Sequence, residues 1–256
     1  MTQTSRAFPY SSFIPAYANG LQLSNNSTTP NTKLDVSSGS ILDSTGTFQL
    51  ALASSVTIDA TVNGINGLDT GSLAASTVYA VYLVADVVNS NNMGAMISTS
   101  YTAPLMPFGY NSFALIGYVA TDGAVHFLKG YWTAGDSPFR LFMYDAPQAT
   151  AVTAGNNTAF ATGLVDLSAL VPKVDNIPVW MYTVFTPGAA SRTLEMQPAG
   201  GTGSPIKITG QVTSVIVTSN SYMYAKLSSS LPKIAYQVSN AGDAVAIDVA
   251  GYNFIL

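Results

Sequence analysis

The sequence contains no cysteine, one glutamate and one histidine among its 256 residues. The absence of cysteine excludes disulfide bonds and thiolate metal sites, and a single histidine leaves zinc without its usual set of ligands. Charged residues make up only 9% of the chain, against about 25% in an ordinary soluble domain. We therefore expect a surface of neutral side chains, as in a protein that packs against neighbours or works outside a cell.

Basic residues are also few, and they are scattered. The formal net charge is −4, with nine Lys and Arg in total. Nucleic-acid binders cluster such residues along one face, so we expect no nucleic-acid partner. A membrane-spanning helix needs about 20 apolar residues. The longest apolar run, at 78–88, is shorter and contains Asp86, so we expect no membrane insertion.

The first ten residues lack the basic start and apolar stretch of a signal peptide. We expect synthesis in a host cytoplasm without secretion, with any exit made as part of an assembly or by lysis.

Helical signals are nearly missing as well. No window carries an apolar stripe at helical spacing, whereas β-branched and aromatic residues are abundant and turn signals recur about every ten residues. This pattern predicts an all-β fold of two β-sandwich or jelly-roll-like modules. We place them at residues 20–145 and 146–256, after an extended N-terminal arm at 1–19. In the second module we expect strands at 179–185, 206–209, 212–218, 221–227, 234–239 and 244–252.

The dipeptide Asp122-Gly123 lies between two apolar runs. Such a pair is typical of a β-hairpin, because a type I′ turn needs positive φ at both central positions. A two-residue loop predicts that Thr121 pairs with Ala124.

The triplet Asp69-Thr70-Gly71 is the motif of an aspartic protease. That enzyme needs two such carboxylates close together, and the chain has no second Asp-Thr-Gly or Asp-Ser-Gly, so two chains would each have to supply one. The alternative is that Asp69 caps a loop and Gly71 supplies an unusual φ. We favour the loop and expect no enzymatic activity, with a dimeric aspartic protease as the distant alternative.

Other candidate sites are weaker still. His126 could serve in a catalytic triad only beside a nucleophile, and the chain has no Gly-x-Ser-x-Gly motif of the kind that carries the serine in one class of triads. We therefore expect His126 to be a packed or solvated side chain. Asp35, Asp43 and Asp59 are too dispersed for an EF-hand loop. We predict no catalytic residue, cofactor or metal site, and the sequence leaves open whether calcium is bound.

Aromatic residues suggest two binding surfaces. The arm is rich in residues that would be exposed in a monomer, and exposed aromatics usually mark a partner surface; these are Phe8, Pro9, Tyr10, Phe13 and Tyr17. Tyr131 and Trp132 stand beside a loop and are candidates for glycan contact, in loops such as 130–136 and 198–205, although packing remains the favoured role. Trp180 lies in an apolar strand and is expected in the core.

Three segments resemble a family of tailed-bacteriophage virion proteins, the head-fibre, tail-fibre or minor structural proteins. They read GLQLSNNSTTPNTKLDVSSG at 20–39, NGLDTGSLAASTVY at 66–79 and TAPLMPFGYNSFALIGYV at 102–119. The resemblance implies a virion component without catalysis, acting as a homotrimer, and it carries over no active-site residue.

Together these observations predict a non-enzymatic virion structural protein: a head or tail appendage, fibre, adaptor or decoration protein. Its partners would be further copies of itself and other virion proteins of the capsid, portal-collar or tail. The alternative is a glycan-binding module of the virion that recognises the host surface. Saturable binding to host polysaccharide would separate the two.

Overall fold

The computed structural model of the protein describes residues 18–88, 92–133 and 139–256. Every regular element within these ranges is a β-strand, which confirms the predicted all-β class. These parts of the chain hold no helix with the length and hydropathy to cross a lipid bilayer. All pairs of named strands are antiparallel.

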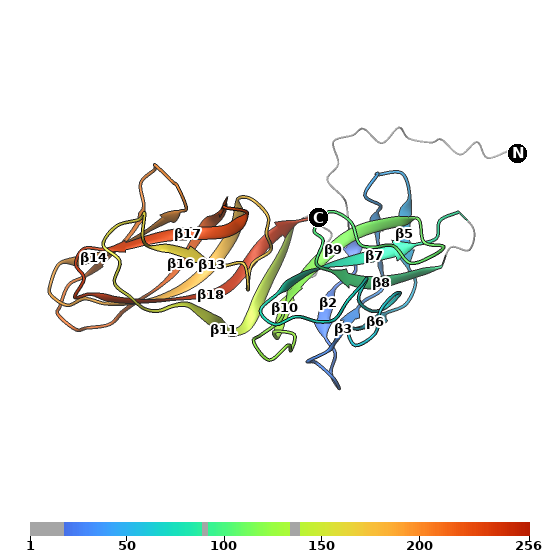
Figure 1. The fold of residues 1–256 in the computed structure, drawn as a ribbon, viewed down its shortest axis with the longest axis horizontal. Coiled ribbons are helices and arrows are strands. Elements are labelled where there is room, and N and C mark those ends of the chain that lie inside the picture. Colours follow the sequence, from blue (N-terminus) through green and yellow to red (C-terminus); the bar gives the residue numbers. More distant parts are fainter. Residues whose placement is uncertain (1–17, 89–91, 134–138) are drawn as a thin grey trace, which may run out of the picture.

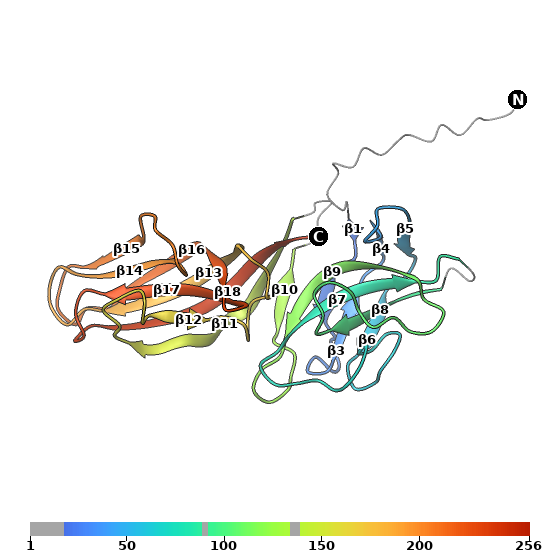
Figure 2. The ribbon, with the colours of Figure 1, turned by 45° about the horizontal axis from the view of Figure 1, so that its top comes forward.

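The strands form two lobes that lie end to end along the long axis of the molecule (Figure 1). We call the part built from β1 to β10 the N-terminal lobe, and the part built from β12 to β17 the C-terminal lobe. Two long strands, β11 (Phe139–Gly155) and β18 (Ala244–Ile255), pair along their length and run from one lobe to the other (Figures 1 and 2).

The N-terminal lobe contains a sheet whose middle strand, β7 (Val78–Ala85), is buried at all eight positions. It lies between β8 (Met93–Ser98) and β9 (Ser112–Ala120). A strand covered on both faces takes a continuous apolar sequence instead of an alternating one, which explains the run VYAVYLVA. The central position of β7 accounts for the longest apolar run of the chain.

The remaining N-terminal strands are short. One small sheet has the order β1-β4-β5, and four further strands continue a large sheet in the order β10-β2-β3-β6. Their bounds are β1 Asn19–Gly20, β2 Leu23–Asn25, β3 Lys33–Val36, β4 Gly39–Leu42, β5 Gln49–Leu52, β6 Val56–Asp59 and β10 Gly130–Trp132.

The C-terminal lobe is folded from the same large sheet, in the order β15-β14-β17-β16-β13-β18-β11, with β12 paired to β17. Contact between β16 and β17 covers only residues 226–228, so the sheet turns back there into two layers, as in a sandwich. The bounds are β12 Leu164–Asp166, β13 Ile177–Thr186, β14 Arg192–Pro198, β15 Ile206–Gly210, β16 Val217–Ser228 and β17 Leu231–Val238.

Two strands that the sequence predicts separately, at 212–218 and 221–227, are not both present. The segments expected at 212–218 and 221–227 are replaced by β16, which begins at Val217. The preceding residues form a turn, since Ser214 has a φ of 59° and its N–H donates to the carbonyl of Pro187 at 2.8 Å. The strand then pairs with β13 without interruption from Val217 to Ala225.

The two-residue hairpin predicted at Asp122-Gly123 is wrong. Thr121 pairs with Phe127 instead of Ala124, and the N–H of Asp122 donates to the carbonyl of His126 at 2.8 Å. The Asp122 carboxylate causes the longer loop, because it accepts from the N–H groups of Ala124 and His126 at 2.8 Å each.

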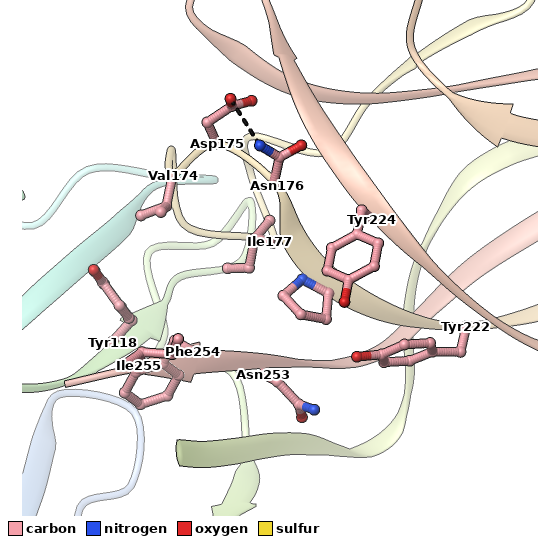
Figure 3. A pocket seen from close by; sticks show the side chains of 11 residues that line it. Tyr118, Val174, Asp175, Asn176, Ile177, Tyr222, Tyr224, Asn253, Phe254 and Ile255 are labelled. Atoms are coloured by element: carbon pink, nitrogen blue, oxygen red, sulfur yellow. Dashed lines mark hydrogen bonds between the residues drawn. The ribbon is translucent and has the colours of Figure 1, made fainter. Parts of the chain in front are cut away.

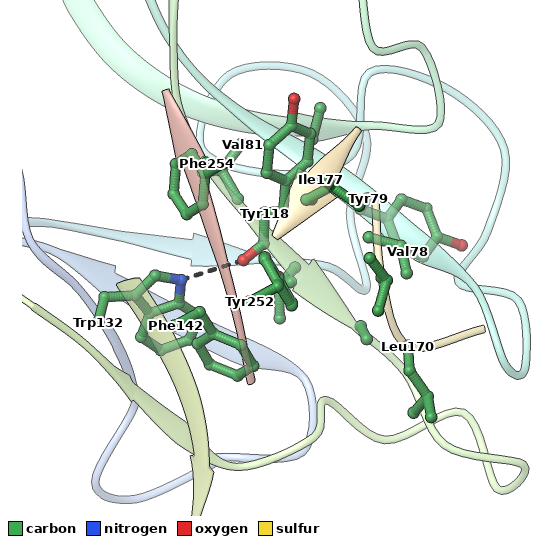
Figure 4. Packing of buried hydrophobic residues seen from close by; sticks show 14 of the residues in the cluster. Val78, Tyr79, Val81, Tyr118, Trp132, Phe142, Leu170, Ile177, Tyr252 and Phe254 are labelled. Atoms are coloured by element: carbon green, nitrogen blue, oxygen red, sulfur yellow. Dashed lines mark hydrogen bonds between the residues drawn. The ribbon is translucent and has the colours of Figure 1, made fainter. Parts of the chain in front are cut away.

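The two lobes share one hydrophobic core at their junction. Tyr252 and Phe254 of β18 pack against Phe142 of β11 and Tyr118 of β9, with ring centroids 5.2 Å apart in the pairs Phe142–Tyr252 and Tyr118–Phe254 (Figure 4). The module boundary predicted at 145/146 falls inside β11. The chain therefore passes between the lobes inside one long strand, whose pairing with β18 shifts register between Met143 and Gln148.

Candidate functional site

Asp69 lies in a loop and is held there by two hydrogen bonds. Its carboxylate accepts from the N–H of Leu105 at 2.9 Å, and its own N–H donates to the carbonyl of Ile97 at 2.9 Å. Gly71 has a φ of 77°, a conformation that a residue without Cβ adopts at little cost. These contacts are the ones expected if Asp69 caps a loop.

His126 is half-exposed in its own turn, and its Nδ1 lies 3.5 Å from Oδ2 of Asp122. The other candidate carboxylates also organise local turns. Asp43 accepts from Thr45, Thr47, Phe48 and Ser112. Burial raises the pKa of Asp43, but these hydrogen bonds outweigh it and hold the pKa below its ordinary value. Among the described residues, no three His, Cys, Asp or Glu side chains gather where a metal could bind.

Asp35 and Asp59 stabilise neighbouring strands β3 and β6. Asp35 accepts from Asn26 at 3.0 Å and from Thr57. Asp59 accepts a hydrogen bond from Thr61 and lies 2.9 Å from the ammonium of Lys33; together these contacts lower its pKa to about 2. These carboxylates serve the fold of the N-terminal lobe.

The residues of the predicted docking arm lie outside the described residues: Phe8, Pro9, Tyr10, Phe13 and Tyr17. The binding role assigned to the arm stays a prediction.

The two residues considered for glycan contact, Tyr131 and Trp132, face opposite sides of β10. Trp132 on β10 is 2% exposed, and its indole N–H donates to the carbonyl of Tyr118 at 3.1 Å (Figure 4). Its ring packs on Phe142, with centroids 4.7 Å apart. Trp132 therefore belongs to the core, as the packing alternative expects. Tyr131 points the other way and is 55% exposed, because successive strand residues face opposite sides.

The exposed aromatic cluster lies instead on the C-terminal lobe. Trp180 on β13 stands directly opposite Tyr222 on β16, with ring centroids 4.7 Å apart, and Tyr224 follows 6.1 Å from Tyr222. The three side chains are 38%, 39% and 48% exposed, respectively. We call Trp180, Tyr222 and Tyr224 the aromatic face. The prediction that Trp180 lies in the core is wrong.

Strand alternation explains why these rings face solvent. On β16, Met223 and Ala225 are buried and the residues between them are exposed. On β13, Val179 and Met181 are buried on either side of Trp180. The inner positions already fill the space between the layers, so the aromatic residues at the alternate positions extend outward.

A pocket of about 310 Å³ adjoins the aromatic face at the junction of the lobes (Figure 3). Its deep part is formed by buried apolar side chains, those of Tyr118, Ile177 and Phe254. Its more exposed lining is mixed: it combines the apolar Val174 and Ile255 with Asp175, Asn176, Tyr222, Tyr224 and Asn253. An apolar pocket with a few polar groups at its edge is the usual form of a small-ligand site.

The polar groups of the pocket differ in their hydrogen bonds. Asp175 accepts from the N–H of Leu227 at 2.9 Å and from the amide of Asn176 at 3.0 Å. Oδ1 of Asn253 has no hydrogen-bond partner among the described residues. Burial raises the pKa of Tyr222, with neighbouring Tyr224 raising it further, and burial raises the pKa of Tyr118 to about 12. Both phenols are therefore neutral hydrogen-bonding groups at ordinary pH.

A second exposed apolar feature lies on the N-terminal lobe. Phe108 is fully exposed and Leu105 is 63% exposed, on the connection between β8 and β9 that also carries Gly109 with a φ of 89°. We call residues 104–109 the apolar loop. It lies within the third segment of the phage resemblance, and the N–H of Leu105 is fixed by Asp69.

The aromatic face was not predicted, although the sequence contains a signal for it. On β16, Asn220 and Lys226 share the period-two face of Tyr222 and Tyr224. A strand face that carries an amide and a lysine normally faces solvent, and the tyrosines between them must face solvent too. Trp180 gives no such signal, since both faces of its strand are largely apolar.

No protein-family model matches the chain, and no curated protein matches it. Among solved structures, it is similar to a carbohydrate-binding module from Cellvibrio mixtus lichenase 5A in complex with cellotriose, at 11% identity and a TM-score of 0.24, over 48% of this chain and 86% of the other. It is also similar to an exo-β-1,3-galactanase from Phanerochaete chrysosporium with galactose, at 10% identity and a TM-score of 0.23, over 93% of this chain and 69% of the other.

A third similarity is to the structure of infectious bursal disease virus, Gx strain, at 11% identity and a TM-score of 0.19, over 96% of this chain and 73% of the other. At these TM-scores, none of the three similarities bears on the function of this chain or on its site.

Proposed function

We propose that the protein is a non-enzymatic structural component of a tailed-phage particle and that it acts through protein–protein assembly. The observation that carries this proposal is the apolar loop, which exposes Phe108 completely and Leu105 by 63%. It lies in a segment, 102–119, whose sequence resembles phage virion proteins. Neighbouring exposed apolar side chains often mark partner surfaces, and aromatic side chains contribute much of the binding energy of such surfaces.

The low charge of the chain supports the same proposal. Only 9% of its residues are charged, and the cores of protein–protein interfaces are depleted in charged residues. Neutral Ser, Thr, Asn and Ala side chains can be buried against a neighbouring subunit without the cost of desolvating an ion. The proposed partners are further copies of the chain, in a homotrimer, and other virion proteins. Light scattering on the purified protein, at 26.7 kDa per chain, tests the trimer, which a monomer or dimer mass would contradict.

Particle incorporation tests the role of the apolar loop. The double change Leu105→Ser and Phe108→Ser should leave the fold intact, because both side chains are exposed, and should lower the amount of the chain in purified particles about tenfold or more. The measurement is quantitative mass spectrometry of particles from a complemented deletion.

The matched control for this experiment is Val62→Ser, which changes an apolar side chain that is 50% exposed on another loop and should leave incorporation unchanged. Normal incorporation of the double variant would contradict the role of the loop, and absence of the wild-type chain from particles would contradict the proposed function as a whole.

A further inference from the structure

The aromatic face offers a ligand three neighbouring rings on one side of a rigid sheet. Trp180 and Tyr222 are held by ladder pairing between β13 and β16, and the alternate residues Val179 and Met223 anchor both strands in the core. Rings fixed in this way lose little side-chain freedom on binding. They suit a ligand with flat, partly apolar surfaces, such as the C–H faces of sugar rings.

The pocket extends this surface inward at one end. Tyr222 and Tyr224 belong to both the aromatic face and the pocket lining (Figure 3), so one ligand could occupy both. A volume of about 310 Å³ is at the lower end of the range for small-molecule sites. The pocket therefore suits the last unit of a chain, with the following units lying on the rings.

The polar groups around the site favour an uncharged ligand rich in hydrogen-bond donors. Oδ1 of Asn253, which lines the pocket, is a buried acceptor without a partner among the described residues. Buried acceptors of this kind are costly unless a donor reaches them. The carboxylate of Asp175 would repel an acidic ligand, and a phosphate chain would also meet the net charge of −4.

We propose that the aromatic face and its pocket bind a neutral saccharide, with a terminal unit in the pocket between Ile177 and Phe254 and the next units on Tyr222 and Trp180. This role goes beyond assembly into a particle, and it concerns the lobe opposite the apolar loop. The site would let an assembled protein hold a glycan on a cell surface or on a neighbouring molecule.

The test uses the full-length purified chain and an array of neutral β-glucan, mannan and galactan oligosaccharides, with sialylated and uronate-containing oligosaccharides as acidic counterparts. We expect saturable binding to at least one neutral series and none to the acidic ones. Trp132 is buried and Trp180 is exposed, so the bound sugar should protect the exposed tryptophan from acrylamide quenching. Tyr222→Ala should weaken binding about tenfold or more, since aromatic contacts of this kind contribute about 1.4 kcal/mol.

The matched control is Phe48→Ala, which removes an exposed aromatic side chain from the N-terminal lobe and should leave binding unchanged. Far-ultraviolet circular dichroism of both variants establishes that each is folded. The proposal is overturned if no neutral oligosaccharide binds at millimolar concentration, if acidic ones bind better, or if Phe48→Ala weakens binding as much as Tyr222→Ala. Binding only of other proteins to the aromatic face would overturn it as well.

Discussion

The chain has two tryptophans, one in each lobe, and they occupy opposite environments. Trp132 ends a three-residue strand in a segment that was predicted as a loop, yet it is buried and hydrogen-bonded. Trp180 stands within a ten-residue apolar strand, yet it is 38% exposed and packs against another exposed ring. Closeness to a predicted loop therefore says little about burial. What decides it is whether the other layer of the lobe covers that face of the strand.

The largest difference between the two tryptophans should be in stability. Trp132→Ala removes a buried ring packed on Phe142 and leaves the carbonyl of Tyr118 without its indole donor. We expect a loss of about 3–5 kcal/mol in the free energy of unfolding, measured by urea denaturation. A loss below about 1 kcal/mol would mean that Trp132 does not occupy the core.

A smaller loss of stability is expected from a change in the strands that join the lobes, β11 and β18. A Cβ on Gly251 would lie 2.3 Å from the carbonyl oxygen of Phe142, a backbone atom that cannot rotate away. Gly251→Ala should therefore cost about 1–3 kcal/mol through overpacking, again measured by urea denaturation. The control is Gly123→Ala, where a Cβ meets no atom within 4 Å. Equal stability of the two variants would contradict the close pairing of β11 and β18 at the junction.

The smallest effect on stability is expected at Trp180. Its ring is partly exposed, so Trp180→Ala should cost about 1 kcal/mol or less, mostly from the lost contact with Tyr222. The same change should abolish the exposed component of tryptophan fluorescence that acrylamide quenches. A loss as large as that of Trp132→Ala would show that the aromatic face is part of the core, and the comparison of the two tryptophans would fail.

The class of the fold could be predicted from local features of the sequence. Alternating residues and turn signals led to the all-β class and to the strands at 179–185 and 206–209, which lie within β13 and β15. The pattern could not show that β11 and β18 pass through both lobes, because pairing between residues far apart in the chain leaves no local signal.

The candidate site could be predicted only in part. Tyr222 and Tyr224 share their strand face with Asn220 and Lys226, and that alternation indicates exposure. The pocket combines Tyr118 of β9, Ile177 of β13 and Phe254 of β18, three residues that only the tertiary fold brings together. The turn at Asp122 was mispredicted for a related reason. Its carboxylate binds two backbone N–H groups, a side-chain effect that the Asp-Gly rule does not include.

The shared strands also determine when the protein can fold during its synthesis. The N-terminal lobe emerges first from the ribosome, but Tyr118 and Phe142 find their partners Phe254 and Tyr252 only in β18. Until that strand has been made, this apolar surface stays open, and such surfaces invite aggregation. Contacts between residues so distant in the chain also form slowly. Completion of the first lobe must therefore wait until β18 has been made.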